Sequence, residues 1–218
     1  MGIYQPSTSN GTTMSFANGY FLTNAGGSQN RFTDLPPGFF SPNQWYHIAL
    51  THIDGGDLIL YVNSNVEGTL SNVNNTINSS SLLRLGLSSR TSSGSYNYNQ
   101  YFNGSIDQVR IYDSALTQSQ VTQLYQENNS TVGTHLFGCV ANYNLDGSAK
   151  ESMGTTAYDG TETDITYRYD GTPTAVDFGV GGKSNYGTRF NGSSSKIVLP
   201  TSTFSPSTFS LSAWCNVT

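Results

Sequence analysis

The sequence predicts an all-β fold, a sandwich of two antiparallel sheets with one short helix near residues 118–126. Three observations predict it. Much of the 218-residue chain consists of short stretches in which apolar and polar residues alternate, the period of a strand with one buried face. Gly, Asn, Ser and Pro interrupt these stretches at close intervals, as turns between antiparallel strands require. Only one segment has the capping residues and apolar spacing of a helix.

The clearest strand covers residues 45–51, in which Tyr46, Ile48 and Leu50 share one face. The Asp-Gly-Gly-Asp sequence at 54–57 is a turn signal, and residues 58–62 return as a second strand, so we expect a β-hairpin here. Further strands are expected at 82–87, 106–112, 137–145, 188–190, 196–199 and 209–217.

The helix is predicted from its first turn. Thr117 can accept a hydrogen bond from the amide of Gln120 while the Gln120 side chain reaches back, and Leu116 can pack on Val121. Val121 and Leu124 begin its apolar stripe. A helix this short must be stabilised by packing on a sheet.

Composition excludes several classes of function. Charged residues make up only 11% of the chain, and the net charge is −5. A partner with a phosphate backbone needs clustered Lys and Arg, so no nucleic acid is expected. No apolar stretch approaches the roughly 20 residues of a membrane-spanning helix, and no secretion signal is visible after Met1.

One segment carries a family resemblance. Residues 102–117, Phe-Asn-Gly-Ser-Ile-Asp-Gln-Val-Arg-Ile-Tyr-Asp-Ser-Ala-Leu-Thr, closely resemble the closing segment of laminin-G-like domains. Residues 44–50 and 58–63 resemble the central hairpin of that family, although Ser64 stands where the family usually has Gly. The resemblance implies a concanavalin-like jelly roll that acts as a binding module.

The second part of the chain resembles the beginning of the same domain, at residues 143–147, 189–197 and 209–214. The two parts therefore stand in reversed order. We predict one permuted domain over 1–218, in which 1–127 matches the C-terminal part of the family domain, 136–218 the N-terminal part, and 128–135 is a linker. The alternative is two half-domains completed by swapping with neighbouring chains. We favour closure within the chain, because swapping also demands order between molecules.

Asp107 is the first candidate for a metal ligand. Strand alternation places it on the same face as Val109 and Ile111, where an unpaired charge is costly. In the family this position resembles a ligand of a structural calcium ion, which prefers several oxygen ligands. Asp146 and Glu151 are weaker candidates for the same ion. The alternative is that these carboxylates pair with Arg or cap local amides.

The sequence does not predict an enzyme. Relatives that cleave glucans carry two Glu residues on one strand, whereas the four here, Glu67, Glu127, Glu151 and Glu162, are widely separated. His47, His52 and His135 have no neighbouring nucleophile or metal-ligand pattern and are interpreted as structural.

Aromatic residues in loops are the candidate ligand contacts, because sugar rings stack on aromatic faces while Asn and Gln bond their hydroxyls. The candidates are Tyr96, Tyr98, Tyr101, Tyr158, Tyr167 and Tyr169. Each of these rings could instead pack locally. Cys139 and Cys215 are both expected to face the core, and a disulfide is left open if their strands are neighbours.

The leading hypothesis is therefore a non-catalytic, adhesion-type module that recognises carbohydrate or cell-surface ligands at an extracellular or virion surface. The alternative is a structural protein of a virion surface, tail fibre or extracellular filament, which predicts a homo-oligomer. A degenerate hydrolase is a third and weaker interpretation.

Overall fold

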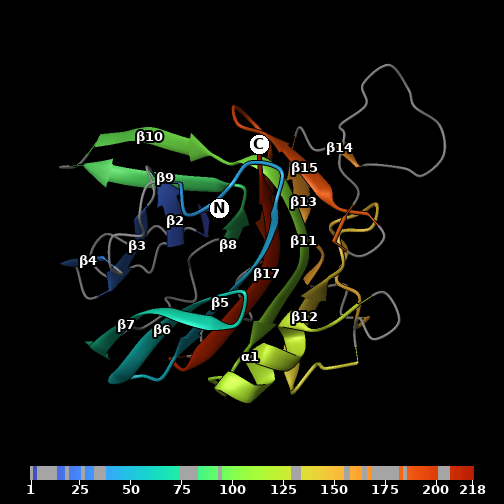
Figure 1. Cartoon of the computed structure of the whole chain (residues 1–218). Helices are drawn as coiled ribbons and strands as arrows, with labels where there is room; N and C mark the ends of the chain where they lie inside the picture. Colours follow the sequence, from blue (N-terminus) through green and yellow to red (C-terminus); the bar gives the residue numbers. More distant parts are fainter. Residues whose placement is uncertain are drawn as a thin grey trace.

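The computed structural model describes the backbone of residues 2–3, 14–17, 20–25, 28–31, 38–73, 83–92, 95–128, 134–154, 158–163, 166–167, 182–183, 186–200 and 207–218. Side chains are described for 38–73, 84–87, 101–128, 134–154, 158–163, 182–183, 186–200 and 207–218. The fold is all-β with one short helix, so the predicted class is confirmed (Figure 1).

The largest sheet contains eight antiparallel strands. Its spatial order is β14-β15-β11-β17-β5-β6-β7, and β12 pairs with β11 beside β15. The bounds are β5 Trp45–His52, β6 Gly56–Val62, β7 Asn65–Val73, β11 Asn103–Tyr112, β12 Cys139–Tyr143, β14 Thr166–Tyr167, β15 Thr188–Asn191 and β17 Phe209–Val217.

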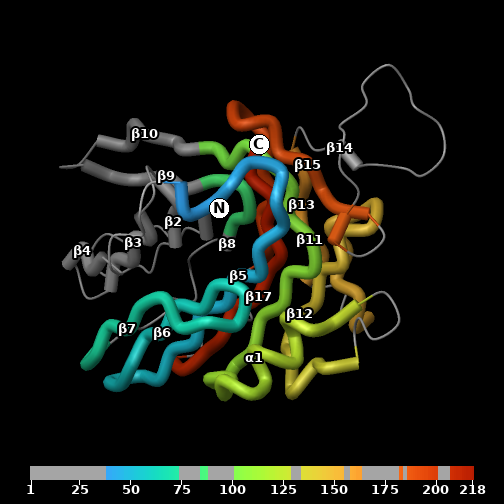
Figure 2. The backbone as a smooth tube through the Cα atoms, in the orientation of Figure 1, coloured from blue at the N-terminus to red at the C-terminus, as the bar shows by residue number. Residues whose placement is uncertain are grey.

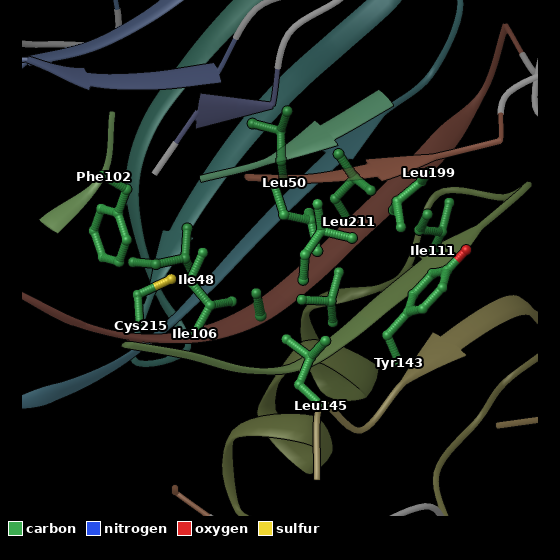
Figure 3. Packing of buried hydrophobic residues seen from close by; sticks show 14 of the residues in the cluster. Ile48, Leu50, Phe102, Ile106, Ile111, Tyr143, Leu145, Leu199, Leu211 and Cys215 are labelled. Atoms are coloured by element: carbon green, nitrogen blue, oxygen red, sulfur yellow. The ribbon is translucent and has the colours of Figure 1, made fainter. Parts of the chain in front are cut away.

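A three-stranded sheet, ordered β13-β16-β8, forms the second layer. Its bounds are β8 Leu83–Leu85, β13 Thr161–Thr163 and β16 Lys196–Leu199. Leu85, Ile197 and Leu199 from this layer belong to the same buried cluster as Leu50 and Leu211 of the large sheet. Figure 3 shows Leu50, Leu199 and Leu211 between the strands of the two layers, so the core lies between the two sheets.

The remaining strands form two smaller sheets, β1 to β4 and the hairpin β9-β10. Their bounds are β1 Gly2–Ile3, β2 Met14–Ala17, β3 Tyr20–Ala25, β4 Ser28–Arg31, β9 Leu87–Ser92 and β10 Ser95–Tyr101. The single strand predicted at 82–87 is wrong in its extent. Gly86, with φ +79°, separates β8 from β9.

The two parts of the chain share one sheet and one core. Strand β17 from the second part lies between β5 and β11 from the first part, as the tube in Figure 2 shows. Its residues 209–216 pair in unbroken register with residues 45–52 of β5. That this arrangement is a permutation of the family's own order stays a prediction.

The helix α1, Gln118–Tyr125, begins as predicted. Thr117 caps the amide of Gln120, and the Gln120 side chain accepts from the amide of Thr117 at 2.8 Å. Val121 and Leu124 are buried and pack, with Tyr61, on the outer face of the large sheet.

Both cysteines are buried, as predicted, but both are free thiols. Cys215 belongs to the core between the sheets, whereas Cys139 packs on the helix side. The reason is a register shift in the β11-β12 pair, which places Cys139 opposite Tyr112 and Ala141 opposite Ile111. Cys139 therefore does not share the face of Ala141, and the thiols lie on opposite faces of the sheet.

Candidate functional site

Asp107 lies on the outer face of the large sheet, so the face predicted by alternation is wrong. It stands opposite Trp214, whereas Ile106 and Ile111 on the same strand belong to the core. The register shifts between Asp107 and Arg110, and the intervening Gln108 has φ +52°. A β-bulge of this kind inserts one extra residue and so reverses the alternation.

The Asp107 carboxylate and the Asn216 amide are buried on the same face of the large sheet. Asp107 is completely buried, and Asn216, two residues beyond Trp214 on β17, faces the same way opposite Ser105. The Asn216 side chain is 1% exposed, and neither its oxygen nor its nitrogen has a hydrogen-bond partner among the described residues. A buried amide without partners is costly, so the Asn216 side chain has hydrogen-bonding capacity that a ligand of its oxygen would satisfy.

The side chain of His47 is neutral. It lies on β5 opposite Trp214, whose other neighbour is Asp107 on β11. Its Nε2 and the hydroxyl of Ser212 are 2.8 Å apart. Burial, together with the smaller effects of the charges of Arg110 and Lys183, lowers the pKa of His47 to about 3. The imidazole is therefore uncharged at neutral pH and is enclosed by protein, which makes it unsuited to proton transfer.

Trp214 is packed inside an aromatic cluster. Its ring stacks on Tyr125 of α1, with centroids 5.7 Å apart and an interplanar angle of 25°, and lies 5.2 Å from His47. The ammonium of Lys183 is 4.3 Å from the centroid of the indole ring, a cation–π contact. Because Trp214 is 5% exposed, it stabilises the outer face and does not offer a free stacking surface.

A buried ion pair joins the sheet to the residue that follows the helix. Arg110 Nη2 and Glu127 Oε2 are 2.7 Å apart, and both side chains are less than 5% exposed. The guanidinium also donates to Gln108 and Asn142. His135 Nδ1 lies 3.1 Å from the other Glu127 oxygen. Glu127 therefore fixes the chain after α1 to the sheet.

The other two predicted metal ligands are engaged in a loop. The Glu151 carboxylate is buried and accepts from the amides of Asn142 and Met153 at 2.9 Å. Asp146 is exposed and accepts from the amide of Tyr186 at 2.9 Å. These contacts are those of carboxylates that cap local backbone. Asp107 lies on β11, away from this loop.

The predicted aromatic contacts fall in several places. Tyr101 is half-buried at the end of β10. Tyr158 packs against the main core, and its carbonyl accepts from the hydroxyl of Tyr143 at 2.7 Å. The loop position predicted for Tyr96, Tyr98 and Tyr167 is wrong, because Tyr96 and Tyr98 lie in β10 and Tyr167 in β14. Their side chains, and all of Tyr169, lie outside the described residues.

The four Glu residues occupy four different elements. Glu67 lies on β7, Glu127 after α1, Glu151 in the loop after β12 and Glu162 on β13. Glu162 accepts from the amide of Ala149 at 2.7 Å. Within the described part of the chain, no three His, Cys, Asp or Glu side chains come together as a metal-binding group.

Sequence reasoning missed Asn216, Trp214 and the Arg110–Glu127 pair. The alternation within 209–217 does place Trp214 and Asn216 on one face. That face lies beside Asp107 because β17 pairs with β11. The two strands are 97 residues apart in the sequence at their nearest ends, so no local pattern predicts the pairing.

Comparison with known proteins gives one match. A family model of the laminin-G type, described as the concanavalin A-like lectin/glucanases superfamily, matches residues 3–122. No curated protein and no solved structure gave a match. Among the described residues, no helix combines the length and the apolar character that crossing a membrane requires.

Proposed function

The chain belongs to the concanavalin A-like lectin/glucanase superfamily, and on that premise we propose that it is a non-catalytic module that binds carbohydrate or cell-surface ligands outside the cell or on a virion. The family match over residues 3–122 carries this proposal, and it is supported by the placement of the four Glu residues on separate elements, unlike the paired Glu on one strand of glucan-cleaving relatives. A retaining glycosidase needs two carboxyl groups about 5 Å apart across the scissile bond, and Glu127 and Glu151 already make internal contacts.

The ligand surface that we propose includes the β9-β10 hairpin. Its strands pair antiparallel, and the register shifts between Tyr96 and Tyr98. Loops and hairpins presented by a rigid sandwich are common positions for binding residues. Residues 96–101 are Tyr-Asn-Tyr-Asn-Gln-Tyr, a composition that combines stacking surfaces with hydrogen-bonding groups. Tyr158 fits this role less well, since its ring packs on the core.

We further propose a structural calcium ion beside Asp107. The carboxylate of Asp107 and the side-chain oxygen of Asn216 are buried on the same face of adjacent strands, and carboxylate and amide oxygens are the ligands that Ca²⁺ prefers. The hydrogen-bonding capacity of Asn216 is unused, which supports an ion or water at this position. Asp146 and Glu151 are not included among the ligands of this proposed ion, since both carboxylates accept hydrogen bonds from backbone amides.

A glycan array probed with the full chain tests the first proposal. We expect binding to a restricted set of glycans and its loss in the double variant Tyr96→Ala/Tyr98→Ala. Tyr158→Phe is the matched control, because it removes one hydroxyl from a ring that packs on the core. An array without any bound glycan, at a protein concentration well above the micromolar range, would contradict carbohydrate recognition.

Terbium luminescence tests the calcium site, because Trp214 stands opposite Asp107 and can transfer excitation to a bound lanthanide. We expect Tb³⁺ emission on excitation of tryptophan, displacement by Ca²⁺, and a loss of affinity of about tenfold or more in Asp107→Asn. Asp113→Asn, at an exposed position on the same segment, should leave the emission unchanged. Equal emission from the two variants would rule out Asp107 as a ligand.

A further inference from the structure

The two parts of the chain are interleaved in the large sheet. Strand β17 pairs with β5 over residues 209–216 and with β11 over seven positions between Gly104 and Tyr112. Its two neighbours both come from the first part of the chain, and β11 also pairs with β12 and β15 from the second part. Figure 1 shows β17 running through the middle of the sheet.

Strand β17 is essential to both of its neighbours. Eight of its nine residues are buried, with Leu211, Ala213 and Cys215 in the core and Trp214 on the outer face. Without it, the facing edges of β5 and β11 would lose their hydrogen-bond partners and the core would open to water. Unpaired strand edges beside apolar surface readily accept another strand.

A short connection joins the first part of the chain to the second part. The buried ion pair holds Glu127 to Arg110 of the first part, and His135 contacts the other oxygen of the Glu127 carboxylate. Strand β12 begins at Cys139. Residues 136–138 lie between His135 and Cys139, and they are the described residues at which the chain can change direction.

This connection is a tight turn with an unfavourable residue. The amide of Cys139 donates to the carbonyl of Leu136, and the two central residues, Phe137 and Gly138, have φ +41° and +79°, as in type I′ turns. Gly138 adopts this conformation without cost, but a bulky residue such as Phe137 is strained there. Strained hinges of this kind favour exchange between copies.

We propose that the segment 139–218 is exchanged between two copies of this chain, so that β17 of one copy fills the gap between β5 and β11 of the other. The described contacts between the first part and residues 139–218 are then remade between copies, and among the described residues of the connection the turn at 136–139 changes. The register with β5 and β11 selects this segment over other extended chains. The exchange does not depend on the proposed ligand.

A disulfide trap distinguishes exchange from closure. Ala49 and Ser212 are directly opposite on β5 and β17. One full-length chain would carry Ala49→Cys and another Ser212→Cys, with tags of different mass, and the two would be mixed at high concentration and oxidised. We expect disulfide-linked heterodimers, identified by mass spectrometry, whose yield rises with protein concentration.

The double variant A49C/S212C in a single chain is the geometric control, because it should form the bond within the chain at low concentration. If it does so while the mixed single variants give no heterodimer at any concentration, the proposal is wrong. Ile48→Cys with Ala213→Cys, a second opposed pair, replaces the first pair if the double variant does not oxidise.

Two hinge variants test the role of the turn. Phe137→Ala and Phe137→Gly both remove the ring, but only Gly adopts positive φ freely. We expect the heterodimer yield to be about five- to thirtyfold lower in Phe137→Gly than in Phe137→Ala, since the left-handed conformation disfavours a non-Gly residue by about that factor. Equal yields would show that the strain at Phe137 does not drive exchange.

Discussion

Replacing Glu127 by Gln removes the only negative charge that contacts Arg110 among the described residues and nearly preserves the shape of the side chain. The guanidinium would then keep two neutral acceptors, Gln108 and Asn142, both at 3.3 Å. Removal of one partner from a buried ion pair costs about 3–5 kcal/mol because the other charge remains buried. We expect a loss of about 3 kcal/mol in the free energy of unfolding, since Gln can still accept one hydrogen bond.

The loss is measurable by two methods. For a domain of this size, about 3 kcal/mol corresponds to a fall in Tm of roughly 6–12 °C, and urea titration followed by circular dichroism gives the free energy directly. Asp113→Asn is the control, because it makes the same chemical change at an exposed position. The contact with His135, which is one third exposed, should contribute little.

A second variant separates charge from packing. The double replacement Arg110→Met/Glu127→Leu removes both charges, and we expect it to recover most of the stability lost in Glu127→Gln, as apolar replacements of buried pairs commonly do. A loss below about 1 kcal/mol in Glu127→Gln, relative to the control, would refute the reasoning. A double variant as unstable as the single one would show that shape, and not charge, dominates.

Three further predictions follow from buried groups. The pKa of His47 is lowered to about 3, so near pH 6.5 the unfolded chain binds a proton that the folded chain does not. The free energy of unfolding should therefore fall as the pH drops from about 6.5 towards 3, and at pH 4 the fall should be about 3 kcal/mol larger than in His47→Gln. Urea midpoints that change in parallel with pH in the two proteins would contradict this. Burial raises the pKa of Cys139 to about 11 and of Cys215 to about 12, so neither thiol should react with a thiol reagent at pH 8 until the chain is unfolded; labelling of the native protein would be the opposing result. Gly86→Ala should lower Tm strongly, because its Cβ would lie 2.1 Å from a core aromatic ring. Gly38→Ala, also at positive φ but with open space around it, should lower Tm less, because only the backbone strain of about 1–2 kcal/mol remains. Similar losses in the two variants would show that backbone strain alone accounts for the cost.

Local patterns predict the helix and several strands, but not β1 to β4, β7 or β10. The capping residues around Thr117 gave the start of the helix, and alternation gave the full extent of β17. The start of the helix depends on interactions between residues close in the chain, and the strand depends on an alternation that is not interrupted. The short strands at 166–167 and 161–163 have no such period and were not predicted.

Alternation failed where the strands are irregular. A bulge at Gln108 moved Asp107 to the outer face, and a register shift beside Tyr112 moved Cys139 away from the face of Ala141. The positive φ of Gln108 has no sequence signal, because Gln is not a residue that favours that conformation. The face of a residue before a bulge therefore depends on the partner strand.

The polar surroundings of Asp107 depended on pairing between distant segments. Asn216 and His47 lie on the same face of the sheet because β17 is placed between β5 and β11, and no local rule specifies that position. The opposite holds for Glu151, whose partners, Asn142 and Met153, are nearby in the chain, so local capping was correctly weighed as an alternative to metal binding.

The central place of β17 has a consequence for synthesis on the ribosome. Strand β11 ends at Tyr112 and β17 begins at Phe209, so the first part of the chain emerges roughly a hundred residues before the strand that completes it. At about 5–20 residues per second, the nascent chain spends on the order of 5–20 s with β5 and β11 unjoined. Yield in a heterologous host should therefore respond to slower translation, lower temperature and chaperone supply more than to changes at the protein surface.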